Sequence, residues 1–230
     1  MAETVEFPSN GGKASGYLVK PASGSGPGVL VIQEWWGLDS GIKTMTDRLG
    51  AAGFVALAPD LYHGELAEHT EMDKAGKLMH SLPPDRAGRD MSAAVDYLAN
   101  NTAVTSKGVG VVGFCMGGML SFIIAAHRGD KVKALVPFYG FPQPGMEPDW
   151  SGLTASVSGH MAEKDDFFPP AAAKALETKL RGLGKDVTLT VHPGTGHAFM
   201  APHNALGTYN AAAYERIWPE VVSFLKDKLK

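Results

Sequence analysis

Apolar runs that alternate with segments of helical spacing make up most of the chain from residue 29 onward. The run Val29 to Ile32 is unbroken, which is typical of a strand buried on both faces of a sheet. Similar runs predict strands near residues 54–58, 109–112, 134–138, 155–159 and 187–191. Apolar positions three and four apart predict helices near residues 40–52, 69–81, 84–100, 116–128, 169–183 and 208–229. Strand and helix therefore alternate along the chain.

Two shorter segments near the N-terminus alternate apolar and polar positions instead. They cover residues 4–7 and 14–19 and are joined through Asn10-Gly11-Gly12, which is typical of a tight hairpin turn. The whole pattern predicts an α/β protein with a mostly parallel central sheet and helices on both faces. Nothing in the interior resembles a linker, so we expect one domain over residues 1–230. In such sheets, ligands bind at the carboxyl ends of the strands.

Composition and charge narrow the class of protein. The chain of 230 residues is 44% hydrophobic and has a formal net charge of −3, as expected for a globular protein with a sizeable core. No run of lysine and arginine indicates a nucleic acid or an anionic membrane as a partner, and no apolar stretch approaches the about 20 residues of a membrane span. The acidic start does not resemble a secretory signal, and one cysteine allows no internal disulfide. We expect a cytoplasmic protein.

The single cysteine, Cys115, lies in Gly113-Phe-Cys-Met-Gly-Gly118, between a predicted strand and a predicted helix. This is the context of a nucleophile elbow, where glycine is required because a side chain would collide with the neighbouring strand and helix. A helix that begins at the cysteine also favours the thiolate. The alternative is that Cys115 is a small apolar core residue, so a nucleophilic role needs partners elsewhere in the chain.

Candidate partners follow later strands in the order nucleophile, acid, histidine, which serine and cysteine hydrolases of this architecture use. The strand ending near residue 159 leads to Asp165 and Asp166, and the strand ending near residue 191 leads to His197 in a glycine-rich loop. Taken singly, either aspartate is equally suited to cap the helix after Pro169, and His197 to be a polar loop residue. The ordered combination predicts a triad of Cys115, Asp165 and His197.

Further motifs accompany the elbow: Gln33-Glu-Trp-Trp-Gly37, Pro59-Asp-Leu-Tyr62, Asp165-Asp-Phe-Phe-Pro169 and Gly196-His-Ala-Phe199. Together they resemble the dienelactone hydrolase family of the α/β-hydrolase fold, over nearly the whole chain. The resemblance implies hydrolysis of a small ester or lactone through a thioacyl enzyme, as in carboxymethylenebutenolidase, without a cofactor or a metal. It also selects Asp165 over Asp166, because the family acid belongs to an Asp-x-Phe-x-Pro pattern.

The resemblance implies roles for residues outside the triad. The backbone N–H groups of Trp35 and Met116 form the oxyanion hole. Glu34 pairs with the thiol of Cys115 until substrate arrives, which keeps the free thiol poorly reactive. Apolar walls of the substrate site are expected from a set of aromatic side chains, some of which will belong to the core instead: Trp36, Tyr62, Tyr139, Phe167 and Phe199.

Two arginines that hold the substrate carboxylate in well-known family members are not evident in this chain. Met72 and Ala201 occupy the corresponding places, and neither can form the bidentate clamp that a carboxylate needs. Lys74, Lys77 and His203 are candidates to compensate, or else belong to the solvated surface. We therefore expect a neutral or weakly polar ester, thioester or lactone as the substrate, and a monomer or small homo-oligomer.

A dinucleotide site is a weaker interpretation. Gly108-x-Gly110-x-x-Gly113, with Asp130 further on, matches the fingerprint formally. In a true fingerprint the glycines follow the strand, whereas here Gly110 lies inside the predicted strand.

A metal site and an inactive fold are two further interpretations of the same residues. His192, His197 and His203 could suggest zinc, but their spacing fits no single helix face and no cysteine joins them. The main non-enzyme interpretation is a catalytically idle hydrolase fold that binds a ligand. The complete set of triad residues favours the enzyme.

Overall fold

Eight strands form one sheet in the computed structural model, which describes residues 1–230. Their order across the sheet is β1-β2-β4-β3-β5-β6-β7-β8. β1 and β2 pair antiparallel, β2 is antiparallel to β4, and every other pairing is parallel. The bounds are β1 Ala2–Ser9, β2 Gly12–Val19, β3 Gly26–Ile32, β4 Val55–Pro59, β5 Val104–Phe114, β6 Val132–Phe138, β7 Ser156–Lys164 and β8 Val187–Gly196.

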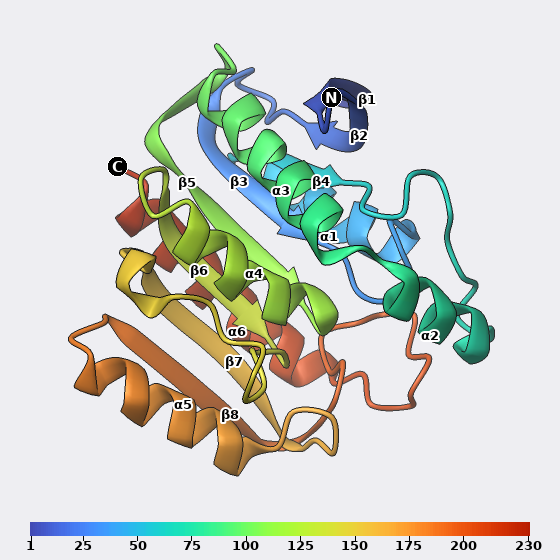
Figure 1. The fold of residues 1–230 in the computed structure, drawn as a ribbon, viewed down its shortest axis with the longest axis vertical. Coiled ribbons are helices and arrows are strands. Elements are labelled where there is room, and N and C mark those ends of the chain that lie inside the picture. The colour runs from blue at the N-terminus through green and yellow to red at the C-terminus, as the bar shows by residue number, and fades with distance from the viewer.

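Helices cover both faces of this sheet, as predicted (Figure 1). One buried cluster joins the sheet to α3, α4 and α5, and another joins it to α1 and α6. The predicted fold class, a mostly parallel sheet between helical layers, is confirmed. The helices are α1 Ser40–Ala51, α2 Met72–Ser81, α3 Pro84–Ala99, α4 Met116–His127, α5 Pro170–Gly182 and α6 Ala211–Lys228, with a 3-10 turn η1 at Trp150–Gly152.

The N-terminal hairpin has the turn that its sequence predicts. Asn10 and Gly11 both have positive φ, 55° and 73°, as a two-residue turn matching the strand twist requires. The pairing Ser9 to Gly12 closes the hairpin at that point.

Some elements begin or end at other residues than the apolar pattern predicts. β5 begins at Val104 rather than 109, because its first residues alternate between exposed and half-buried positions outside the core. The helix expected over 69–81 begins at Met72, since the Glu68 N–H bonds the Glu71 carboxylate instead of continuing a helix. β7 and β8 run past their apolar cores to Lys164 and Gly196, which pair with each other.

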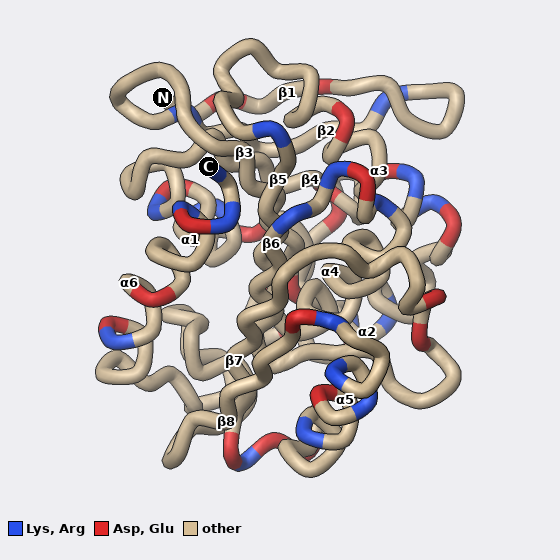
Figure 2. The backbone as a smooth tube through the Cα atoms, turned by 90° about the vertical axis from the view of Figure 1, so that its left-hand side faces the viewer, with Lys and Arg blue, Asp and Glu red and all other residues tan.

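Charged residues of both signs are interleaved along α3 and α5 (Figure 2). None of the helices combines the length and the apolar character that crossing a membrane demands.

Candidate active site

Cys115 lies in the sharp turn between β5 and α4, one residue beyond the end of the strand. Its φ of 54° and ψ of −118° form a conformation that residues with a side chain rarely adopt and that the surrounding structure must enforce. A Cβ at Gly113 would meet the backbone of Gly117, and a Cβ at Gly117 would meet the carbonyl oxygen of Ile32. Both positions flanking the cysteine therefore require glycine.

His197 connects Cys115 to an acid. It directly follows β8, and Asp165 directly follows β7. Because these parallel strands are neighbours in the sheet, the first residue after each lies at the same edge. The Nδ1 atom of His197 is 2.8 Å from Asp165 Oδ2, and its Nε2 atom is 3.1 Å from Cys115 Sγ. The structure thus brings together the three residues predicted as a triad.

The two candidate acids have different environments. Asp165 is buried, and its Oδ1 accepts hydrogen bonds from the backbone N–H groups of Phe167 and Phe168 at 3.0 and 2.9 Å. These bonds fix the carboxylate so that its other oxygen faces His197. Asp166 is exposed and makes no hydrogen bond. The geometry therefore places Asp165, and not Asp166, against the imidazole.

The charge on His197 follows from these contacts. Burial alone lowers the pKa of the imidazole, but the hydrogen bonds to Asp165 and Cys115 outweigh it and raise that pKa to about 10. The ring is therefore protonated at neutral pH. The protonated Nε2 lies 3.1 Å from the sulfur of Cys115.

Two backbone amides are available beside the elbow. Met116 is the first residue of α4, so its N–H precedes the first turn and has no intrahelical acceptor. The Trp35 N–H has no acceptor among the hydrogen bonds of the structure. The Tyr62 hydroxyl donates to the Trp35 carbonyl at 3.2 Å and lies 3.6 Å from Met116 Sδ, which connects the two segments. Burial, with the Cys115 charge nearby, holds the pKa of Tyr62 well above its ordinary value, so the phenol keeps its proton.

Glu34 is buried, and its hydrogen bonds go to residues other than the cysteine. Its Oε1 accepts from the Tyr139 hydroxyl at 3.3 Å, and its Oε2 is 3.1 Å from His203 Nε2. No hydrogen bond joins it to Cys115. The contact between carboxylate and thiol that the family resemblance implies is therefore not what the structure shows.

His203 belongs to a cluster that the sequence did not predict. Its ring stacks on that of His69 with 3.9 Å between centroids, and His69 Nε2 is 2.6 Å from Asp39 Oδ2. The edge of Trp36 packs against both imidazoles. These residues come from three separate loops, so no local sequence signal joins them.

The cluster has the spacing of a metal site but not its orientation. Ligand atoms of Asp39, His69 and His203 all lie within 4.8 Å of one another. His203 Nδ1 accepts from the Ala205 N–H at 3.1 Å, and its other nitrogen meets Glu34. Both nitrogens are thus occupied, and two stacked rings 21° apart cannot aim their lone pairs at one ion without turning. A hydrogen-bonded cluster fits these residues better than a metal centre.

The predicted aromatic walls divide into buried and exposed members. Trp36 and Phe199 are 2% and 0% exposed, so they support the site from behind. Tyr139 is also buried and packs its edge on His197. Phe167 is 62% exposed, with its ring centroid 4.9 Å from that of His197. Among the five, only Phe167 offers a large open surface beside the histidine.

Two aromatic neighbours of the site were missed by the sequence analysis. Phe168 stacks on His197 with a centroid distance of 5.8 Å, and Phe141 packs against Phe168 at 5.4 Å. Phe168 is adjacent to Phe167 in the same motif, so its place beside the site could have been predicted from the sequence. Met119 belongs to the first turn of α4, and Met146, in the loop after β6, is half exposed.

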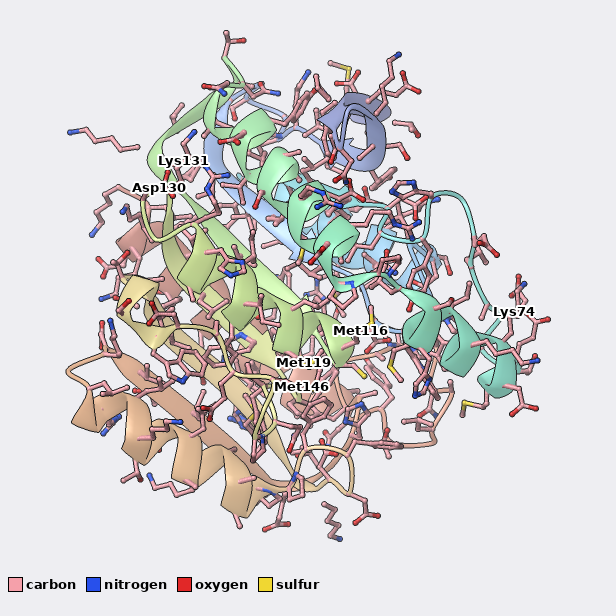
Figure 3. The ribbon with its side chains drawn as sticks, viewed as in Figure 1. Lys74, Met116, Met119, Asp130, Lys131 and Met146 are labelled. Atoms are coloured by element: carbon pink, nitrogen blue, oxygen red, sulfur yellow. The ribbon has the colours of Figure 1, made fainter.

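The positions of the missing arginines hold no cation. Met72 starts α2 and is 37% exposed, whereas Ala201 is buried. Lys74 pairs with Glu71 at 3.5 Å on the outer part of α2, away from Met116 (Figure 3). Lys77 is exposed and forms no ion pair. Among the three candidates to replace the missing arginines, only His203 contacts a predicted site residue, Glu34.

His192, the remaining histidine of the set considered for zinc, forms a separate buried pair with His160. His192 Nε2 is 3.0 Å from His160 Nδ1, and Arg216 donates to His192 Nδ1 at 3.3 Å. Burial, with the neighbouring charges, lowers the pKa of His160 to about 3 and that of His192 to about 4. His192 therefore does not join His197 and His203 in a metal site.

A strained residue between β5 and α4, with an acid directly after β7 and a histidine directly after β8, is the arrangement of an α/β hydrolase. The pattern of the Dienelactone hydrolase family matches residues 14–229, and the chain belongs to this family of hydrolases that act on carboxylic ester bonds.

Individual relatives agree with the family. The chain is 38% identical to Protein usf of Aquifex pyrophilus and 36% identical to an Aquifex aeolicus protein provisionally named carboxymethylenebutenolidase, in both cases over all of each chain. A dienelactone hydrolase-like promiscuous phosphotriesterase from metagenomic libraries has the same fold. Its TM-score is 0.85 with 24% identity, over 100% of this chain and 99% of that one.

Proposed function

We propose that the protein is a cysteine-dependent hydrolase of small esters or lactones that works through a thioacyl enzyme. The observation that carries this proposal is the continuous contact from Asp165 through His197 to Cys115, with distances of 2.8 and 3.1 Å. A histidine that only packed in a loop would have no reason to meet both an acid and a strained cysteine.

In the first half of the reaction, the Cys115 thiolate attacks the ester carbonyl and a C–S bond forms. The amides of Trp35 and Met116 stabilise the negative oxygen. His197 gives its proton to the leaving alkoxide as the C–O bond breaks. A thioester between Cys115 and the acyl group remains.

In the second half, neutral His197 takes a proton from water, and the resulting hydroxide attacks the thioester. The C–S bond breaks, the acid product leaves, and the thiolate and imidazolium are restored. Asp165 keeps Nδ1 of the ring protonated and steadies its charge throughout.

The proposed substrate is neutral or weakly polar. The chain provides no arginine at Met72 or Ala201, and the buried carboxylate of Glu34 has no lysine or arginine within ion-pair distance. A second carboxylate, from an anionic lactone, would be repelled there. Exposed Phe167 offers an apolar surface for an acyl or alkyl group.

Hydrolysis of p-nitrophenyl acetate and of a dienelactone by wild type beside Cys115→Ala tests the proposal. We expect turnover by wild type alone, faster on the neutral ester, with circular dichroism showing that the variant is folded. Equal rates in both proteins would refute the role of the cysteine. No turnover in either would favour a catalytically idle fold that binds a ligand.

A further inference from the structure

The loop after β3 is held in place by the loop after β4. These strands are parallel neighbours, so both loops leave the sheet at the same edge (Figure 1). The Trp36 carbonyl accepts from the Ala67 N–H at 2.9 Å, and the Trp35 carbonyl accepts from the Tyr62 hydroxyl at 3.2 Å. The Trp35 N–H, one of the two amides proposed to stabilise the negative oxygen, therefore belongs to a loop that is bonded from outside.

The direction of the Trp35 N–H depends on the two peptide units that meet at its Cα. The first unit contains this N–H and the Glu34 carbonyl, which accepts from the Gly37 N–H at 3.4 Å within the same loop. The second unit contains the Trp35 carbonyl, whose partner is the Tyr62 hydroxyl. Both units are thus held, and the second is held only by a side chain from the neighbouring loop.

The Tyr62 hydroxyl has two neighbours and a single proton to donate. Met116 Sδ lies 3.6 Å away, but a thioether is a weak acceptor, so the proton is directed to the Trp35 carbonyl. Tyr62 is only 4% exposed. Burial raises the pKa of this phenol well above its ordinary value, and the charge of Cys115 acts in the same direction. The hydroxyl therefore remains a donor.

The turn that carries Tyr62 is anchored by two buried carboxylates. Asp60 accepts from the Tyr62 N–H at 3.1 Å and from the Gly64 N–H at 2.6 Å. The next residue, His63, has a φ of 54° and places its Nε2 2.8 Å from Oδ2 of Asp90 in α3. Asp60 and Asp90 are 8% and 1% exposed. These contacts fix the direction of the tyrosine ring before any substrate binds.

We propose that Tyr62 is the positioning residue of the oxyanion hole, whose hydroxyl holds the Trp35 peptide so that its N–H points at the oxygen of the reacting carbonyl. This inference rests on the proposed function, because the oxyanion hole belongs to the same site. It gives Tyr62 a different role from that of an apolar wall for the substrate. The role matters for rate, because a misplacement of about 1 Å can cost about 10²-fold.

Tyr62→Phe removes the hydroxyl and leaves the ring. Both halves of the proposed reaction place a negative charge on the carbonyl oxygen, so both depend on the oxyanion hole. We expect kcat/KM for p-nitrophenyl acetate to fall about 10- to 100-fold, somewhat less than the loss of a whole donor. Circular dichroism should show that the variant is folded. A wild-type kcat/KM in Tyr62→Phe would overturn the proposal.

Reaction with 2,2′-dithiodipyridine separates the nucleophile from the oxyanion hole. The sulfur of Cys115 attacks one sulfur of the probe, the S–S bond breaks, and thiopyridone leaves without a carbonyl oxygen being involved. The chain has no second cysteine to compete. Tyr62→Phe should react within about twofold of wild type, because the thiol is unchanged. A loss as large as that in ester hydrolysis would overturn the proposal, since Tyr62 would then act on the cysteine or on the fold.

Tyr17→Phe is the matched control. It also removes a hydrogen-bonded hydroxyl, which donates to Asp47 of α1 at 2.9 Å and touches no residue of the site. Both reactions should proceed at wild-type rates in this variant. A fall in ester hydrolysis equal to that of Tyr62→Phe would overturn the positioning role, because loss of any such bond would then suffice.

His63→Asn carries the test if Tyr62→Phe does not fold. Asparagine tolerates positive φ, so the backbone of the turn is retained, but its shorter side chain does not span the distance to Asp90. We expect kcat/KM on the ester to fall about threefold or more and the reaction with 2,2′-dithiodipyridine to stay within about twofold of wild type. An unchanged kcat/KM would overturn the proposal.

Failure of this inference is distinguishable from failure of the proposed function. Cysteine-dependent turnover by wild type, with no loss in Tyr62→Phe, would leave the hydrolase intact and reject only the positioning role. Absence of cysteine-dependent turnover in wild type would instead reject the proposed function, and the positioning role with it.

Discussion

The site contains two buried pairs of histidine and carboxylate with similar distances and different chemistry. His197 lies 2.8 Å from Asp165, and His203 lies 3.1 Å from Glu34. The difference is the partner of the second ring nitrogen. In His197 it meets the sulfur of Cys115, and in His203 it accepts from the backbone of Ala205. The first ring can transfer a proton to a reacting group, whereas the second can only hold its acid in place.

Replacing the carboxylate by an amide should therefore lower activity unequally in the two acids, Asp165 and Glu34. The larger loss is expected for Asp165→Asn. An amide cannot stabilise the imidazolium and favours the wrong tautomer, so we expect kcat/KM for p-nitrophenyl acetate to fall about 10³- to 10⁴-fold. The matched control is Asp166→Asn, one residue along in the same loop, which should match wild type. Equal losses in the two variants would contradict the assignment of the acid.

The buried pair of His160 and His192 is a third arrangement, in which no carboxylate meets either ring. Its contribution can be measured from the pH dependence of the free energy of unfolding. The pKa of His160 is lowered to about 3 by burial, and its Nε2 has no hydrogen-bond partner. Below pH 6.5 the unfolded chain takes up a proton at this residue that the folded chain does not. The free energy of unfolding must then fall as the pH falls, by up to about 1.4 kcal/mol per pH unit for this residue.

Urea unfolding of His160→Gln between pH 6.5 and 4 measures this contribution. We expect its unfolding free energy to decrease less steeply with acidification than that of wild type. The two slopes should differ by up to the about 1.4 kcal/mol per pH unit that one bound proton gives. His80→Gln, which removes an exposed histidine of α2, should retain the wild-type slope. An unchanged slope in His160→Gln would mean that the buried ring does not resist protonation.

Glu34→Gln is the counterpart of Asp165→Asn in the second pair. Glu34 touches His203 and Tyr139 but not the thiol, so removal of its charge should change kcat/KM on the neutral ester by less than about tenfold, or 1.4 kcal/mol. Steady-state kinetics beside Asp165→Asn gives the comparison directly. A loss as large as that of Asp165→Asn would place Glu34 in the chemistry itself.

The smallest effect is expected where the second pair is anchored. Asp39→Ala removes the cap of α1 and the partner of His69, and loss of such a cap costs about 1 kcal/mol. Asn210→Ala removes a comparable cap from α6 without touching the site. Both variants should lose similar stability in chemical denaturation. Only Asp39→Ala should also lower kcat/KM for p-nitrophenyl acetate, by a few fold, and equal rates in the two variants would show that this cluster does not support the site.

The fold and one of the two pairs could be predicted from sequence for the same physical reason. Buried parallel strands are continuous apolar runs, and each of Cys115, Asp165 and His197 follows such a run, so their meeting is a consequence of the sheet. His203 and His69 follow no such rule. They meet through loops far apart in the sequence, where side-chain packing decides the contact. The contact between His203 and Glu34 could therefore not be predicted from local sequence patterns, although His203 was among the candidates to replace the missing arginines.

The hairpin at the margin of the sheet has a consequence for concentrated solutions. β1 leaves one side of its backbone unpaired, and an open strand edge is a template for adding further chains. Pro8 removes one N–H from this strand, and the exposed ion pairs Glu6–Lys13 and Glu3–Lys20 place charged groups beside the open edge. We expect these residues to protect the protein from stacking into fibrils along this margin.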